Sequence, residues 1–414
     1  MGFLEESQLL SEQEETGTPK CGGACKRNAK CSRYCMKPYG NGQNGILFIG
    51  SQPGKKEDST GKQLIGDCGI YFKGILRKAG IDPEEILKTN AVRCHHSSEI
   101  EKAEVEACRI FLNQVIEEHK PSVIVPMGSS AIYSIIGQEW SGNMGGFQQW
   151  VDFVIPSRKY NAWICPVYHP EWILEKGDEV LHLLFQQQLE RVVECQGTRP
   201  DITWNPADEV EVLYDPKEVM RRIRKYRQLG GTIAFDYETT GLKPDTDKME
   251  IVSNSICWNG EETIAYMMDD PGVISATKRI LEDPTIGKIA SNLKFEERWT
   301  RKKLGVTVEN WAWDTMLAAH TLDNRRGICS IKVQAYIRYG IEDYNSHIHS
   351  FLEAKEANDL NEIRKLSIDD LLLYNGLDSL LEYRVAVDQM RECGLPWVSE
   401  KTKKTKRKRR ERGT

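Results

Sequence analysis

The sequence lacks the features of a membrane or secreted protein. It contains no run of about 18 apolar residues, the length that a membrane-spanning helix requires. Its first 20 residues are acidic and polar, without the basic stretch followed by an apolar one that marks a secretion signal. We also find no internal repeat. These absences predict a soluble, cytoplasmic protein.

The sequence also lacks a net positive charge. The formal net charge is -5 at pH 7, although residues 401–414 contain nine Lys or Arg and one Glu. The other residues contain 47 basic and 60 acidic side chains, and such a body gives no indication of nucleic-acid binding. The basic end suits phosphate groups. Three interpretations of it stay open: a solvated disordered tail, a nucleic-acid contact and a nuclear address.

The length and composition predict two domains. The chain has 414 residues, of which 40% are hydrophobic, and this is enough for two ordinary cores. A stretch with a glycine, two prolines and no helical pattern is typical of a linker between them. We therefore expect a disordered start (residues 1–20), a first domain (21–195), the linker (196–208), a second domain (209–395) and a basic disordered tail (396–414).

In the first domain, short β-branched runs alternate with amphipathic stretches. This alternation is typical of a parallel sheet with helices on both faces, an α/β/α sandwich. The pattern predicts strands at 46–49, 88–92 and 122–126, extended runs at 150–156 and 162–168, and helices at 69–78, 99–120 and 180–194.

The second domain begins as a sheet and ends in helices. The Asn259-Gly260 pair is a strong turn signal and predicts a hairpin. The pattern predicts strands at 232–237, 251–258, 262–267 and 286–291, and helices at 216–229, 274–281, 295–303, 314–321 and 368–391.

Two acidic residues lie at the end of the strand predicted at 232–237. Asp236 and Glu238 are two positions apart, so the alternation of side chains along a strand points both to the same face. Two carboxylates held together repel one another unless a cation lies between them, and oxygen ligands suit Mg²⁺ or Mn²⁺. Taken alone, this pair is a weak signal, and an exposed acidic strand end is the commoner explanation of it.

Two later motifs bring further polar groups into the same domain. Asn292 and Glu296 follow a predicted strand and are four residues apart, so they can share a helical face. Tyr374 and Asp378 have the same spacing in the last predicted helix.

These three motifs, in this order, resemble those of the proofreading 3'-5' exonuclease domain of DNA polymerase I and its phage relatives. The resemblance implies an RNase H-like fold with a mixed sheet, and two Mg²⁺ or Mn²⁺ ions that hydrolyse phosphodiesters and release nucleoside 5'-monophosphates. It implies that Asp236, Glu238 and Asp378, together with Glu296, hold the ions and that Tyr374 orients the attacking water. Glu296 departs from the family, which usually has Asp there.

A Pro-Gly turn follows the first predicted strand, in the run Gly50-Ser51-Gln52-Pro53-Gly54. The first domain also contains the runs Thr89-Asn90-Ala91-Val92-Arg93-Cys94, Ala107-Cys108-Arg109, Val125-Pro126-Met127-Gly128 and Tyr168-His169-Pro170. Together these motifs resemble those of the iron-sulfur, family 4-like uracil-DNA glycosylases. The resemblance implies a base-binding pocket and a DNA-binding domain. The family's acid is replaced by Ser51 and its stacking aromatic by a residue around Leu64, which makes glycosylase activity doubtful. The matching pocket positions are Gln52, Pro53, Gly54, Asn90 and His169.

Cysteines cluster at the start of the first domain. Four fall within 15 residues, and clustered cysteines in an intracellular protein more often bind metal than form disulfides. The glycosylase resemblance implies a 4Fe-4S cluster, with zinc as the alternative because His95 and His96 lie nearby. The matching ligands are Cys21, Cys25, Cys94 and Cys108, with Cys31 and Cys35 as alternates.

Together these patterns predict a 3'-5' DNA exonuclease fused to a glycosylase-like DNA-binding domain, acting in phage-type replication or repair. The order of domains resembles the front part of certain phage replicative polymerases, and the polymerase part is not expected in this chain. The expected partners are DNA with a free 3' end and a separately encoded DNA polymerase, in the host cytoplasm if a phage encodes the chain. An RNase D-like exoribonuclease and a non-catalytic accessory subunit of a polymerase remain as alternatives.

Overall fold

The computed structural model describes residues 25, 35–95, 97–260, 262–344, 347–354, 356 and 358–396. The predictions for Cys21, Cys31, the first 20 residues and the basic tail from residue 397 lie outside these residues. The chain forms two compact units, one made of Met1–Ile202 with Ile337–Gly340 and the other of Thr203–Tyr336 with Ile341–Thr414. Among the helices described, none is both long and apolar enough to cross a membrane.

The first unit is built on a five-stranded sheet in the order β2-β1-β3-β5-β4. All neighbouring strands are parallel except β4 and β5. The predicted α/β class is therefore confirmed. The strands are β1 (Ile46–Gly50), β2 (Leu87–Asn90), β3 (Val123–Pro126), β4 (Ile155–Ser157) and β5 (Ala162–Ile164).

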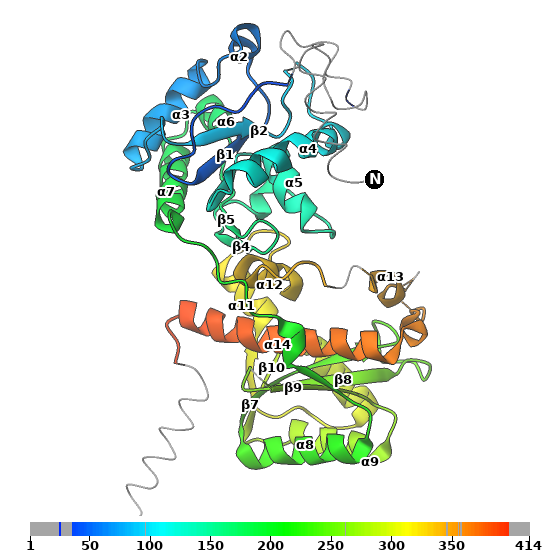
Figure 1. Cartoon of the computed structure of the whole chain (residues 1–414). Coiled ribbons are helices and arrows are strands. Elements are labelled where there is room, and N and C mark those ends of the chain that lie inside the picture. The colour runs from blue at the N-terminus through cyan, green and yellow to red at the C-terminus, as the bar shows by residue number, and fades with distance from the viewer. Residues whose placement is uncertain are drawn as a thin grey trace, which may run out of the picture. The chain divides into compact units, whose positions relative to one another are not determined.

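Helices cover both faces of this sheet, with α3 and α7 on one side and α4 and α5 on the other (Figure 1). On the α3 and α7 side, the core joins Phe48 and Val125 of the strands to Phe72 and Phe185 of the helices. The helices are α2 (Lys55–Thr60), α3 (Asp67–Lys78), α4 (Lys102–His119), α5 (Ser129–Ile135), α6 (Pro170–Lys176) and α7 (Glu179–Cys195).

The second unit contains a six-stranded mixed sheet in the order β11-β10-β7-β8-β9-β6. Its centre is β7, which pairs in parallel with β10 and antiparallel with β8. The strands are β6 (Val210–Leu213), β7 (Gly231–Thr239), β8 (Ile251–Trp258), β9 (Glu262–Met267), β10 (Ile286–Ala290) and β11 (Trp311–Asp314). The mixed α/β class predicted for this domain is also confirmed.

The two faces of this second sheet are covered by different helices (Figure 1). Helices α8 (Pro216–Leu229) and α9 (Pro271–Leu281) cover one face, and α14 (Ile368–Glu392) crosses the other. The remaining helices are α10 (Leu293–Trp299), continued by a π-helical turn (Thr300–Leu304), α11 (Thr315–Leu322), α12 (Ile331–Tyr339) and α13 (His349–Leu352).

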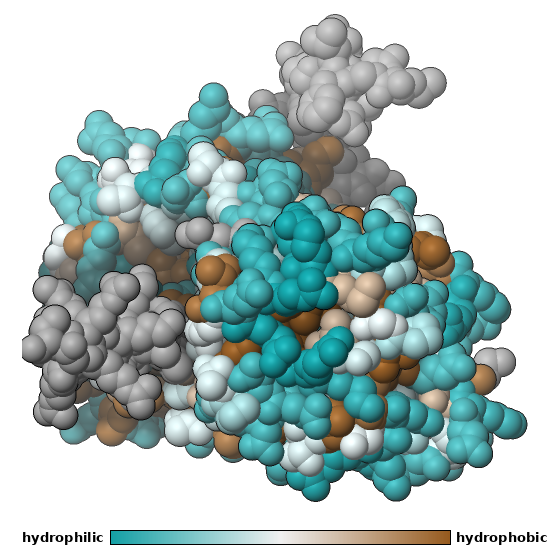
Figure 2. Space-filling view, turned by 90° about the horizontal axis from the view of Figure 1, so that it is seen from below, coloured by the Kyte–Doolittle hydropathy of each residue, from teal (hydrophilic) through white to brown (hydrophobic). Residues whose placement is uncertain are grey.

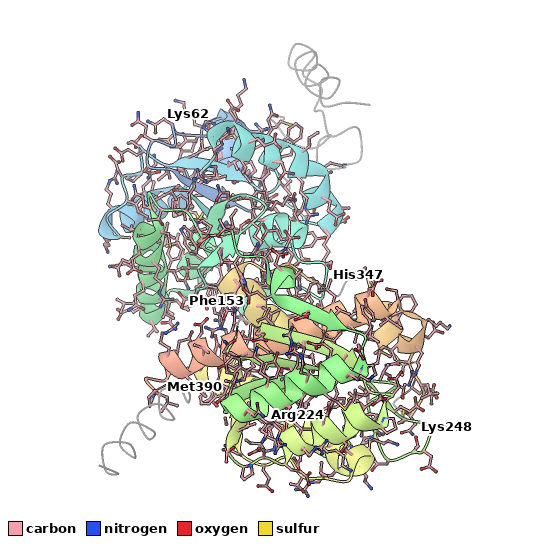
Figure 3. All side chains as sticks on the ribbon, turned by 60° about the horizontal axis from the view of Figure 1, so that its bottom comes forward. Lys62, Phe153, Arg224, Lys248, His347 and Met390 are labelled. Atoms are coloured by element: carbon pink, nitrogen blue, oxygen red, sulfur yellow. The ribbon has the colours of Figure 1, made fainter. Side chains whose placement is uncertain are left out.

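Helix α8 shows why the sheet is buried on the face away from α14. Its apolar residues Val219, Ile223 and Tyr226 recur at helical spacing and are all buried against the sheet. Arg224 lies between them in sequence and points outward (Figure 3). The surface seen from below is accordingly mainly hydrophilic, with scattered apolar patches (Figure 2).

Strand β7 divides its side chains between these two faces. Ile233, Phe235 and Tyr237 belong to the core on the α8 and α9 side, whereas Ala234 packs with residues of α14. Since side chains alternate along a strand, Asp236 and Glu238 follow Ala234 onto the α14 side. The fold therefore places the acidic pair under the last helix.

Candidate functional site

Three of the carboxylates singled out in the sequence come together between β7 and α14. One oxygen from each of Asp236, Glu238 and Asp378 lies within 4.8 Å of the others. Asp236 and Glu238 are half-buried and Asp378 is buried. Residues more than a hundred positions apart in the chain thus form one acidic cluster.

Asn375 ties α14 to the strand that carries the acids. Its side-chain amide donates to the backbone oxygen of Asp236 at 3.1 Å and to the Asp236 carboxylate at 2.8 Å. Its own carbonyl oxygen accepts from the Ser253 hydroxyl at 3.0 Å, and its backbone oxygen accepts from Ser255 at 2.7 Å. These bonds fix the rotation of the helix, and therefore the direction of Tyr374 and Asp378.

A lysine that the sequence analysis did not single out lies inside the cluster. Lys332 of α12 donates to the Tyr374 hydroxyl at 3.0 Å and lies 3.4 Å from both carboxylate oxygens of Asp378. Its ammonium group also faces the rings of Tyr344 and Tyr374, 5.4 and 5.0 Å from their centroids. The Tyr344 hydroxyl donates to Asp378 as well. Asp378 is therefore held in place by two donors.

Two more carboxylates extend the cluster. Glu296 of α10 and Glu382 of α14 are each 2% exposed, and one oxygen of each has no hydrogen-bond partner. The other Glu382 oxygen accepts from the backbone N–H of Ser291 at 3.1 Å. Glu382 was missed in the sequence, although it stands four residues after Asp378 and so shares its helical face.

The start of α10, which carries Glu296, is positioned by a further acid. Asp314, at the end of β11, accepts hydrogen bonds from the backbone N–H groups of Asn292 and Leu293, each at 3.1 Å. Asn292 adopts a left-handed conformation with φ of 65°, which asparagine tolerates better than most residues. Asn292 of the predicted motif therefore forms the turn at which α10 begins.

The electrostatics of the cluster show a shortage of positive charge. Burial raises the pKa of Asp236 and of Glu238, and the neighbouring carboxylates raise both further, whereas Lys332 lowers them. Burial followed by the charge of Asp236 also raises the pKa values of Glu296 and Glu382.

Lys332 responds in the opposite sense. Burial alone would lower the pKa of Lys332, but Asp378, Glu238 and Asp236 outweigh burial and raise it. One ammonium group thus faces three carboxyl groups, and the remaining oxygens are hard ligands of the kind that divalent cations prefer.

The first unit contains a separate cavity of about 510 Å³. All five residues singled out for the glycosylase-like pocket line it: Gln52, Pro53, Gly54, Asn90 and His169. Leu64, which stands near the position of the missing aromatic residue, lines it too.

Lys88 also lines this cavity, and the sequence analysis did not identify it. Its ammonium group donates to Gln63 Oε1 at 2.6 Å and to Asn90 Oδ1 at 3.1 Å, and Asn90 Nδ2 is buried without a partner. Burial lowers the pKa of Lys88 to about 8. Burial and then the charge of Lys88 lower the pKa of His169 to about 4, so its imidazole is neutral at pH 7.

The described cysteines of the predicted cluster site include a group of neighbours. Cys25, Cys94 and Cys108 are buried, and Cys35 is half-buried. A hydrogen bond with Cys94, then burial, then the charges of Cys94 and Cys108 raise the pKa of Cys35. The structure therefore brings Cys35, one of the alternates, beside Cys94 and close to Cys108.

Comparison with known families covers most of the chain. Residues 37–192 match the family model of the uracil DNA glycosylase superfamily, and residues 210–386 match that of a 3'-5' exonuclease family. The type-4 uracil-DNA glycosylase of Thermotoga maritima is 29% identical over 157 residues, which are 37% of this chain and 78% of that protein. The enzyme of Saccharolobus solfataricus is 26% identical over 180 residues, with 41% and 80% covered.

A DNA polymerase of Bacillus phage SP01 matches both units together. It is 21% identical over 322 residues, which are 70% of this chain and 34% of the polymerase, so the chain spans about a third of that relative. Among solved structures, Escherichia coli RNase D has 15% identity and a TM-score of 0.34, covering 48% of this chain and 50% of that chain. Both resemblances found in the sequence are thereby confirmed: the chain combines a domain of the uracil DNA glycosylase superfamily with a 3'-5' exonuclease domain.

Proposed function

We propose that the chain is a 3'-5' DNA exonuclease that hydrolyses phosphodiesters with two divalent cations and releases nucleoside 5'-monophosphates. The convergence of Asp236, Glu238 and Asp378 within 4.8 Å carries this proposal. The donor set fits Mg²⁺ or Mn²⁺, because all of its ligand atoms are carboxylate oxygens and they are under-compensated by Lys332. The unpartnered oxygen of Glu296 makes this residue a further candidate ligand.

Bound cations would generate a nucleophilic hydroxide near neutral pH and stabilise the attacking and leaving oxygens. The residues of the chain prepare that site. Asn375 orients Asp236, while Lys332 and Tyr344 orient Asp378. Since the Tyr374 oxygen accepts from Lys332, its own O–H remains available to orient the attacking water.

DNA is the proposed substrate because the polymerase of Bacillus phage SP01 matches both units of this chain in one alignment. We propose a role in phage-type DNA replication or repair, on DNA with a free 3' end and together with a separately encoded polymerase.

End-labelled DNA and RNA, each incubated with Mg²⁺ and with EDTA, test the function. We expect stepwise shortening of DNA from its 3' end, with Mg²⁺ only. Shortening of RNA but not DNA would contradict the substrate, and an absence of Mg²⁺-dependent hydrolysis on both would contradict the activity.

We propose a 4Fe-4S cluster for the first unit, with Cys94, Cys108 and Cys35 as three of its ligands. The fourth is Cys25 or one of the cysteines outside the described residues. Four thiolates suit such a cluster, and three thiols lie together here. Iron and acid-labile sulfide are to be measured on protein purified without oxygen; a colourless protein with stoichiometric zinc would contradict the cluster.

A further inference from the structure

The cavity of the first unit contains an amine whose hydrogen-bond partners among the described residues are neutral. Lys88 lies on β2, two residues before Asn90, so both side chains point to the same side of the strand. Within the described residues, its hydrogen-bond acceptors are the amide oxygens of Gln63 and Asn90. A lysine placed inside a domain for structural reasons normally pairs with a carboxylate. Lys88 instead faces the cavity with its charge uncompensated by a direct ion pair.

This arrangement changes what the cavity presents to a ligand. A uracil edge has an N3–H donor and two carbonyl acceptors, so its recognition by an asparagine requires a free amide oxygen. Here Asn90 Oδ1 accepts from Lys88, which leaves it one lone pair, and Asn90 Nδ2 is buried without a partner. The cavity therefore places an amine, which can act as a nucleophile, directly beside the asparagine at the base-reading position.

We propose that Lys88 is a Schiff-base residue that reacts with the aldehyde of an abasic deoxyribose in DNA. An abasic sugar is the product of any glycosylase, and it leaves empty the space that a base would fill. Its ring-opened form carries an aldehyde at C1'. Lysines 55 and 56 at the same cavity provide positive charge for the flanking phosphates.

The chemistry balances without any further reactant. The lone pair of neutral Lys88 Nζ forms a bond to C1' while the π bond of the carbonyl group breaks, and a proton passes from Nζ to the carbonyl oxygen to give a carbinolamine. The hydroxyl group then leaves C1' with the remaining Nζ proton as water, and the nitrogen lone pair forms the C1'=Nζ imine. Addition of water reverses both steps, and borohydride makes the bond permanent by delivering hydride to C1'.

The surroundings of Lys88 keep part of the amine neutral near physiological pH. The titratable groups that face it are Glu57 of α2, Cys68 of α3 and His169 at the start of α6. Glu57 and Cys68 raise the pKa of Lys88, but burial is the larger effect and lowers it to about 8. About half of the amine is therefore uncharged at that pH, as nucleophilic attack requires.

The test uses the full chain and a labelled oligonucleotide with one abasic site, in EDTA so that the exonuclease is inactive, with sodium cyanoborohydride. We expect a covalent adduct on a denaturing gel, absent with intact DNA, and a peptide mass that places it on Lys88. Lys88→Met and Lys88→Arg should each reduce the yield at least about tenfold, because neither side chain forms an imine. Lys78→Met, at an exposed lysine of α3 that does not line the cavity, is the matched control and should retain the adduct.

The rate of trapping by the wild-type chain should rise with pH, with a midpoint at about 8. Three outcomes would overturn the proposal: no adduct, an adduct of undiminished yield with Lys88→Arg, or mapping of the wild-type adduct to another amine. The mapping needs no variant, so the result does not depend on whether a substituted protein folds. None of these outcomes bears on the proposed exonuclease.

Discussion

Replacement of Lys332 by methionine tests the electrostatics of the acidic cluster directly. Its ammonium lies 3.4 Å from Asp378, and the two side chains are only 19% and 7% exposed. Two unit charges at 3.4 Å attract by about 5 kcal/mol at an effective dielectric constant of about 20. This attraction is similar to the loss of roughly 3 to 5 kcal/mol in the free energy of unfolding when one partner of a buried ion pair is removed.

The stability that Lys332→Met loses should depend on the bound metal. Without divalent cations, Lys332→Met leaves the carboxylates uncompensated, and we expect the unfolding temperature of the second unit to fall by on the order of 10 °C. With saturating Mn²⁺, the bound cations supply positive charge and the fall should be smaller. By linkage, Mn²⁺ then stabilises the variant more than the wild type.

Differential scanning calorimetry of the full chain measures this effect, because the transition that responds to Mn²⁺ identifies the second unit and the other transition is an internal control. Lys225→Met is the matched substitution: Lys225 pairs with Glu262 at 2.9 Å, but its side chain is 43% exposed. We expect this substitution to lower the free energy of unfolding by at most about 1 kcal/mol, with and without metal. An equal fall for Lys332→Met in both conditions would refute the reasoning.

Three further predictions concern activity, pH and the cluster. Asp236→Ala should abolish exonuclease activity without lowering the unfolding temperature, because the substitution removes a metal ligand and relieves the repulsion between carboxylates. Glu250→Ala, which removes an exposed acid, is the control and should retain activity. Residual hydrolysis by Asp236→Ala would count against the site. The raised pKa of Glu296 means that this carboxyl group binds more protons in the native metal-free chain than in the unfolded chain above the ordinary value of 4.5. Stability should therefore fall as pH rises from 4.5 through the raised pKa. A rise in the unfolding temperature over that interval would contradict this sign. Cys35→Ser should lower bound iron relative to Cys393→Ser, whose cysteine is exposed, and equal iron in both variants would remove Cys35 from the ligand set.

Most regular elements could be predicted because their sequence patterns are strong. The helix predicted at 216–229 matches α8 and the predicted hairpin matches β8 and β9, since apolar spacing and an Asn-Gly turn specify both locally. Strand β6 was missed. It has four residues and pairs with β9 far along the chain, so tertiary contacts rather than its own pattern determine it.

The acids of the site could be predicted because each stands in a motif with a fixed spacing. Lys332, Tyr344 and Lys88 could not, because a single lysine or tyrosine has no periodicity that distinguishes a buried role from an exposed one. Their positions follow from the packing of α12 and β2 against distant elements. Glu382 did carry a signal, since it continues the four-residue spacing of Tyr374 and Asp378, but burial of its face by leucines is the commoner expectation.

Tyr374, Asp378 and Glu382 all lie on helix α14, so the backbone position of one cannot shift along the helix without the other two. Insertion of one residue between Tyr374 and Asp378 would rotate everything beyond it by about 100° around the helix axis. Evolution at this site is therefore confined to exchanges of side chains, and changes of length have to fall outside the helix.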